Sequence, residues 1–116
     1  AGAHAIHNGL TVLEECHKMN HGEKVAFGTI TQLVLENIPG DELEDIILWC
    51  IELGLPVTLA ELGITEITDE KLMAVAAAAC SENDTLHNMP FPVTPETVCA
   101  ALKAADAYGR YYLGQQ

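Results

Sequence analysis

Apolar residues recur at helical spacing along nearly the whole chain, and this pattern constrains the fold more than any other feature of the sequence. In the first segment Ala3, Ile6 and Leu10 fall three or four positions apart, which places them on one face of a helix. Similar segments follow, separated by turn residues such as Pro39-Gly40, and no convincing strand interrupts them. The pattern predicts a single all-α domain of about six helices. The predicted helices cover residues 3–15, 23–37, 42–53, 58–63, 68–79 and 95–114.

Short capping motifs mark several of the predicted helix starts. A polar side chain at the first position can accept a hydrogen bond from a backbone N–H that has no partner inside the helix. The motifs are Thr58 with Glu61, Thr94 with Pro95, and Asp41 with Glu44. Gly54 is placed to end the helix over residues 42–53, because glycine adopts the left-handed backbone at little cost.

The size and charge of the chain limit its domain count and its partners. With 116 residues, 49% of them hydrophobic and 19% charged, the chain can bury one modest core, and we expect one domain spanning residues 1–116. The formal net charge is −12 and the lysines are scattered. Such a surface repels phosphates and anionic lipids, which argues against nucleic acid and membranes as partners.

The cysteines and the hydropathy pattern point to a reducing compartment. Cys16, Cys50, Cys80 and Cys99 are widely spaced and form no Cys-x-x-Cys pair, which is typical of free thiols. No stretch approaches the roughly 20 apolar residues that a membrane-spanning helix needs. We therefore expect a cytoplasmic protein. The chain opens on helix-favouring residues without a methionine or a cap, as though it were cut from inside a helix.

Four of the five histidines lie between positions 4 and 21, which makes this segment the candidate metal site. A helix from His4 to Glu15 advances about 16 Å, and the six steps on to His21 cover at most about 20 Å. The two imidazoles can therefore meet only if the first helix ends near Glu15 and the chain turns back at once. Spacing alone leaves open that these are surface or hydrogen-bonded histidines.

Other chemical candidates have simpler explanations. His87-Asn88, in a proline-rich loop, is interpreted as structural, and the acidic residues 41–45 as a solvated helix start. Trp49 is interpreted as a core or subunit-interface anchor. Gly22 would let the backbone approach the histidine site closely. The sequence has no His-Glu-x-x-His motif and no glycine-rich phosphate loop, so it offers neither the zinc-protease arrangement nor a main binding site for a dinucleotide.

Several motifs stand in order along the chain: Ala3-His4-Ala5-Ile6-His7-Asn8-Gly9, His21-Gly22-Glu23-Lys24-Val25-Ala26-Phe27-Gly28, Leu55-Pro56-Val57-Thr58-Leu59, the segment from Leu86 to Phe91, and Ala104-Ala105-Asp106. Together they resemble the signature of the bacterial glycerol dehydrogenases, within the iron-containing alcohol dehydrogenase superfamily. The resemblance covers the whole chain. It implies the C-terminal helical metal-binding domain of a dehydroquinate synthase-like, iron-containing alcohol dehydrogenase fold, without its N-terminal NAD-binding domain.

The resemblance also implies a site and a reaction. His4 and His21 match the family's two histidine metal ligands, and no residue here matches its third ligand, an aspartate that lies upstream. His7 would face the same cleft and orient substrate or solvent. The implied reaction is NAD-linked oxidation of glycerol to dihydroxyacetone at zinc acting as a Lewis acid. The fragment alone is expected to be inactive, and the protein to form homo-oligomers.

Two other interpretations remain open at this stage. The chain could come from another metal-dependent alcohol or polyol dehydrogenase of the same superfamily, because these enzymes share a ligand set. It could also be a helical interaction module without catalytic activity. The histidine cluster disfavours the second of these interpretations.

Overall fold

The computed structural model describes residues 2–81 and 93–116, with side chains from residue 5 to residue 80 and from residue 93 onward. Within these ranges every regular element is helical, which confirms the predicted all-α class. The elements are α1 (Gly2–Leu10), the 3₁₀ turn η1 (Glu14–Cys16), α2 (His21–Leu35), α3 (Gly40–Glu52), the 3₁₀ turn η2 (Ala60–Leu62), α4 (Asp69–Ser81) and α5 (Pro95–Leu113). The helix predicted over residues 58–63 is only the turn η2, so the described chain holds five α-helices rather than six.

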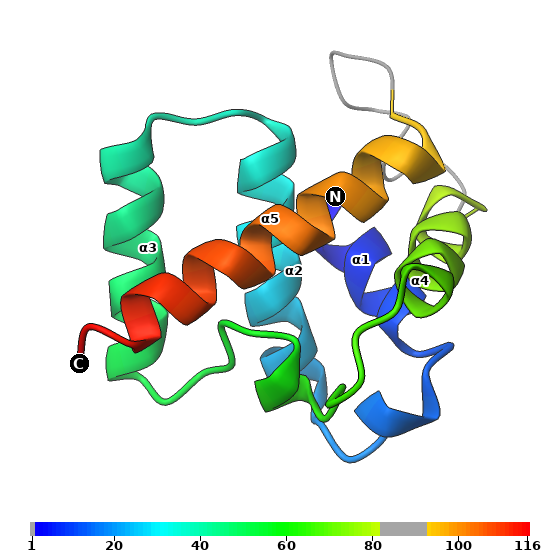
Figure 1. The fold of residues 1–116 in the computed structure, drawn as a ribbon, viewed down its shortest axis with the longest axis horizontal. Helices are drawn as coiled ribbons and strands as arrows, with labels where there is room; N and C mark the ends of the chain where they lie inside the picture. The colour runs from blue at the N-terminus through cyan, green and yellow to red at the C-terminus, as the bar shows by residue number, and fades with distance from the viewer. Residues whose placement is uncertain (1, 82–92) are drawn as a thin grey trace.

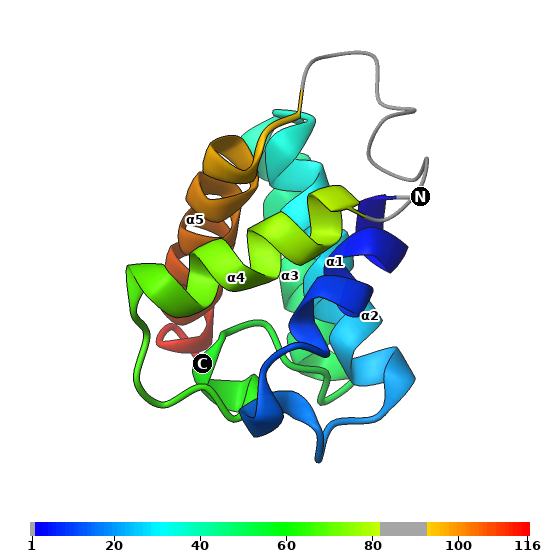
Figure 2. The ribbon, with the colours of Figure 1, turned by 90° about the vertical axis from the view of Figure 1, so that its right-hand side faces the viewer.

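The longest helix, α5, lies across the others and joins the two sides of the molecule. It contacts α2 and α4, and nearer its C-terminal end it also contacts α3 (Figure 1). On the other side of the molecule α1 packs against α2 and α4, and α4 lies between α1 and α5 in the view of Figure 2. The first and second helices are therefore neighbours, which is the arrangement that the histidine site requires.

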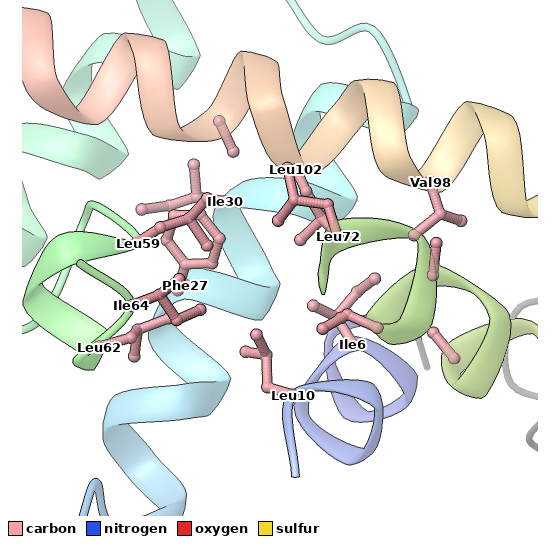
Figure 3. Close-up of a cluster of buried hydrophobic side chains, with 14 of the residues drawn as sticks. Ile6, Leu10, Phe27, Ile30, Leu59, Leu62, Ile64, Leu72, Val98 and Leu102 are labelled. Carbon is pink, nitrogen blue, oxygen red and sulfur yellow. The ribbon is translucent and has the colours of Figure 1, made fainter. Parts of the chain in front are cut away.

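Fully buried side chains from all five α-helices and from the segment between α3 and α4 meet in one core, most of which Figure 3 shows. They include Ile6 and Leu10 of α1, Phe27 and Ile30 of α2, Leu72 of α4, Leu102 of α5, and Leu59, Leu62 and Ile64 of the connecting segment. Burial of each such side chain contributes about 1.5–3 kcal/mol. Because Ile6 and Leu10 are both in the core, α1 must keep the face that carries them turned towards the other helices.

Side-chain caps set the starts of α2 and α5. Asn20 accepts a hydrogen bond from the backbone N–H of Glu23, whose carboxylate accepts one from the N–H of Asn20. This capping box starts α2 at His21, two residues earlier than predicted. Thr94 caps α5 as predicted, with Thr97 as its reciprocal partner.

Two other boundary predictions had different outcomes. Gly54 follows α3 with a φ of 76°, as expected of a helix-ending glycine. The predicted capping pair of Asp41 and Glu44 is wrong, because α3 already begins at Gly40 and Pro39 precedes it without a side-chain cap. The start of α3 is exposed, so water can satisfy its first N–H groups without a side-chain cap.

The first helix is shorter than predicted. It ends at Leu10 instead of Glu15, because the next N–H groups bond to carbonyls three residues back, Val12 to Gly9 and Leu13 to Leu10. These bonds tighten the last turn, and Thr11 adds a hydroxyl bond to the carbonyl of Asn8. The return towards α2 therefore begins earlier than the sequence indicated.

Trp49 does not lie in the core. Its side chain is 60% exposed on α3, so the interpretation as a core residue is wrong. Leu53, one turn further on, is also exposed, as are Tyr108 and Tyr111 of α5. The interface role of Trp49 stays a prediction.

A buried carboxylate ties α5 to the segment that precedes η2. Asp106 is 3% exposed; its Oδ1 accepts a hydrogen bond from the N–H of Leu59 at 2.8 Å, and its Oδ2 accepts one from Nε of Arg110 at 2.9 Å. We expect Asp106→Ala to lower the free energy of unfolding by about 2–3 kcal/mol, because the Leu59 N–H then stays buried without a partner. Urea unfolding of the chain measures this loss.

The matched control for this prediction is Asp69→Ala. Asp69 pairs with Lys103 at 2.6 Å, but its side chain is 83% exposed, so its removal should cost less than about 1 kcal/mol. Equal losses for the two variants would contradict the structural role of Asp106.

Candidate functional site

Two of the N-terminal histidines meet where α1 packs against α2. Nδ1 of His21 lies 3.1 Å from Nε2 of His7, and the two ring centroids are 4.3 Å apart with the rings inclined at 63°. Nδ1 of His7 lies 3.0 Å from the side-chain oxygen of Asn8. His7 is half-buried and His21 is exposed. The structure thus brings two imidazoles together from positions 14 residues apart.

The loop that returns the chain from α1 to α2 is held by specific contacts. Nζ of Lys71 on α4 lies 2.7 Å from the Glu15 carboxylate, and this hydrogen bond lowers the pKa of Glu15. A Cβ at Gly63 would lie 2.5 Å from the carbonyl oxygen of Glu15, so the backbone approaches η1 closely there. The loop then reaches the Asn20 cap, which fixes His21 as the first residue of α2.

The predicted site residues have different outcomes. His7, expected to face the cleft, lies against His21. His4 lies on α1 one turn before His7, but its side chain is outside the described part, so its approach to His21 stays a prediction. Residues 87 and 88 also lie outside the described residues.

Gly22 does not serve a close backbone approach within the described residues. It is exposed, and a Cβ at this position would meet only Oδ1 of Asn20 at 3.6 Å, which is an ordinary contact. Among the described residues, an alanine at this position would therefore fit without a clash.

The cysteines do not contribute to the site. No disulfide links them, and Cys16, Cys50 and Cys99 are buried. Burial raises the pKa of Cys16 to about 11 and also raises that of Cys50. Burial thus disfavours the thiolate of Cys16 and Cys50, which is the form that binds metal.

The donor set fits a divalent metal in part. Neutral imidazole nitrogens are ordinary zinc ligands, and the exposed His21 carries a second ring nitrogen besides the Nδ1 that contacts His7. Among the residues whose side chains are described, no three histidines, cysteines or carboxylates gather to hold an ion. Because a catalytic zinc usually has three protein ligands, these residues can supply only part of a site.

Two contributors to this region were not predicted from the sequence. Asn20 with Glu23 fits the capping-box pattern, so this start of α2 could have been found from the spacing. The bond between Asn8 and His7 leaves no such signal, because it depends on the side-chain rotamers of adjacent residues.

No helix in the described ranges has the length and apolarity needed to cross a membrane. No family model matches the sequence. The sequence is nevertheless 59% identical over 115 residues to a glycerol dehydrogenase of Citrobacter freundii, an alignment that covers 99% of this chain and 32% of that protein. It is 54% identical over 110 residues to a glycolaldehyde reductase of Halobacterium salinarum, covering 95% of this chain and 30% of that protein.

Solved structures show the same relationship. A glycerol dehydrogenase structure from Schizosaccharomyces pombe superposes with a TM-score of 0.94 at 40% sequence identity, covering 99% of this chain and 29% of that one. The chain therefore spans about a third of the length of the relatives that it matches.

Proposed function

Because this chain is homologous along its whole length to part of the glycerol dehydrogenases, we propose that it forms the C-terminal helical part of an NAD-dependent enzyme that oxidises glycerol to dihydroxyacetone. The observation that carries the proposal is the 59% identity to a glycerol dehydrogenase over nearly the entire chain. The junction of α1 and α2, which carries His4, His7 and His21, gives the proposal a local chemical basis.

We assign His4 and His21 as ligands of a divalent metal, with zinc as the metal. The third ligand, an aspartate, would come from outside this chain. A bound divalent cation supplies Lewis-acid chemistry, which favours the ionised form of a substrate hydroxyl before hydride leaves the carbon. His21 suits this role because it is exposed at a helix start and its backbone is held by the neighbouring cap.

The nicotinamide cofactor is assigned to the remainder of the enzyme. The chain has no glycine-rich loop of the kind that cradles phosphates, and its charge of −12 disfavours anionic ligands. We therefore expect the 116-residue chain alone to be inactive. We also place the complete enzyme in the cytoplasm.

The test of the substrate assignment compares alcohols with the complete enzyme. We expect kcat/KM for glycerol and 1,2-propanediol to exceed that for butanol, because vicinal hydroxyl groups can both engage the metal centre. Glycolaldehyde reduction is a necessary further arm, since a relative of 54% identity carries that name. A higher kcat/KM for butanol or for glycolaldehyde would contradict the assignment of glycerol as the substrate. An inactive protein that also binds no metal would favour a non-catalytic helical module.

We also propose that the complete enzyme is a homo-oligomer. Tyr108 and Tyr111 on α5 line one surface hollow, and Trp49 and Leu53 lie one turn apart on α3. All four side chains are exposed, and large exposed apolar side chains that lie side by side mark interaction surfaces. Light scattering coupled to size-exclusion chromatography should give a mass that is a multiple of the subunit mass. A strictly monomeric profile would contradict this proposal.

A further inference from the structure

Asn8, His7 and His21 form a short chain of hydrogen bonds that ends at the candidate metal ligand. The side-chain oxygen of Asn8 lies 3.0 Å from Nδ1 of His7, and Nε2 of His7 lies 3.1 Å from Nδ1 of His21. Both distances are those of ordinary hydrogen bonds. The two hydrogen bonds use both ring nitrogens of His7, so His7 links Asn8 to His21.

For neutral imidazoles, the chemistry of these groups sets the direction of each bond. An amide oxygen can only accept, so Nδ1 of His7 must carry the hydrogen that it donates to Asn8. A neutral imidazole has one N–H, and Nε2 of His7 is therefore an acceptor. It follows that His21 donates from its Nδ1, and in that tautomer the ring lone pair is on Nε2.

We propose that His7 and Asn8 are positioning residues that hold His21 in the Nδ1–H tautomer and direct its Nε2 lone pair to the cation. The inference rests on the proposed function for the identity of that cation. A metal-bound histidine commonly donates its second N–H to a neighbouring acceptor, which fixes both the tautomer and the ring plane. Here the acceptor is another imidazole, itself oriented by an amide.

The backbone on both sides of the pair is well held. Ile6 and Leu10 flank His7 on α1 and are fully buried, and a Cβ at Gly9 would lie 2.5 Å from the carbonyl oxygen of Val75. The helix therefore cannot rotate without losing core contacts. On the other side, the capping box fixes the first turn of α2, which carries His21. The edge-on contact between the His7 and His21 rings also restricts the orientation of the His21 ring.

The tautomer can be observed directly in this chain, without metal. Long-range ¹H–¹⁵N correlation spectra at about pH 8.5, above the ordinary imidazole pKa of about 6.5, distinguish the two N–H forms. We expect His21 to be in the Nδ1–H form in the wild-type chain and to lose this preference in His7→Phe. Asn8→Leu should weaken the preference as well, and this variant keeps the test valid if His7→Phe fails to fold. An Nε2–H form of His21 in the wild-type chain would overturn the inference.

Zinc affinity of the complete enzyme gives the second readout. We expect His7→Phe to weaken zinc binding about 10–100-fold, the range found when a residue that supports a metal ligand is lost. His17→Phe is the control, because His17 is exposed and bonds only to the carbonyl of Thr11 among the described contacts. An unchanged affinity would overturn the positioning role. A loss as complete as that of His21→Ala would also overturn it, because His7 would then be a ligand itself.

These outcomes are separable from failure of the proposed function. Zinc retained in His21→Ala would remove the metal assignment, whereas the tautomer of His21 in the metal-free chain would still be measurable. Conversely, zinc that is lost in His21→Ala but bound normally in both Asn8→Leu and His7→Phe would leave the proposed function intact and end the inference.

Discussion

Gly109→Ala is expected to destabilise the chain by about 3 kcal/mol or more, the upper range for overpacking in a protein interior. Gly109 is buried in α5, where a Cβ would lie 1.7 Å from the carbonyl oxygen of Val57 and 2.7 Å from its carbonyl carbon. These atoms belong to backbone, so no side-chain rotation can relieve the overlap. The bond from Leu59 to Asp106 holds the same segment against α5, so the segment cannot withdraw without breaking that contact.

Urea unfolding of the chain measures this effect, and Gly40→Ala is its matched control. A Cβ at Gly40 would meet nothing within 4 Å, and Gly40 is the first residue of α3. Alanine there should be neutral or stabilise the chain by up to about 1 kcal/mol, because glycine is a poor helix former. Equal midpoints for the two variants would contradict the close packing of α5 on the segment around Val57.

The second large effect is expected for His21→Ala in the complete enzyme. Loss of a metal ligand should remove zinc and lower kcat/KM by more than about a hundredfold, beyond the loss expected for a residue that only supports a ligand. The helical fold should persist, because His21 is exposed and the cap of α2 is made by Asn20 and Glu23. Elemental analysis, steady-state kinetics and thermal melting measure the three quantities.

His17→Ala is the control for this variant. His17 is an exposed histidine of the same segment, and its Nε2 lies 3.1 Å from the carbonyl oxygen of Thr11. It should keep zinc and near-normal turnover. Normal zinc content in His21→Ala would remove His21 from the ligand set, and a collapsed fold would show that its main role is structural.

Helical periodicity and local capping signals were sufficient to predict the fold class and most helix positions. The Thr94-Pro95 start of α5 and the glycine end of α3 depend on residues close in sequence, so their physics is visible in the sequence. The end of α1 has no such clear local signal. Apolar residues continue at helical spacing to Leu13, but after Leu10 the backbone forms 3₁₀ hydrogen bonds, and the Thr11 hydroxyl bonds to the carbonyl of Asn8.

The candidate site could be predicted only in part. The density of histidines located the region, and the turn-back that the spacing demanded is present, although it starts at Leu10. Which imidazole meets His21 depends on the rotation of α1 about its axis, which the core sets through Ile6 and Leu10. The link between Leu59 and Asp106 spans 47 positions, and no local pattern encodes it.

The most direct test of the proposed function is the position of zinc in crystals of the complete enzyme, located by anomalous scattering at the zinc absorption edge. We expect one ion about 2.0–2.1 Å from a nitrogen of His4 and from Nε2 of His21, with a carboxylate from outside this chain completing the protein ligands. Zinc bound at a site that excludes His21 would contradict the account.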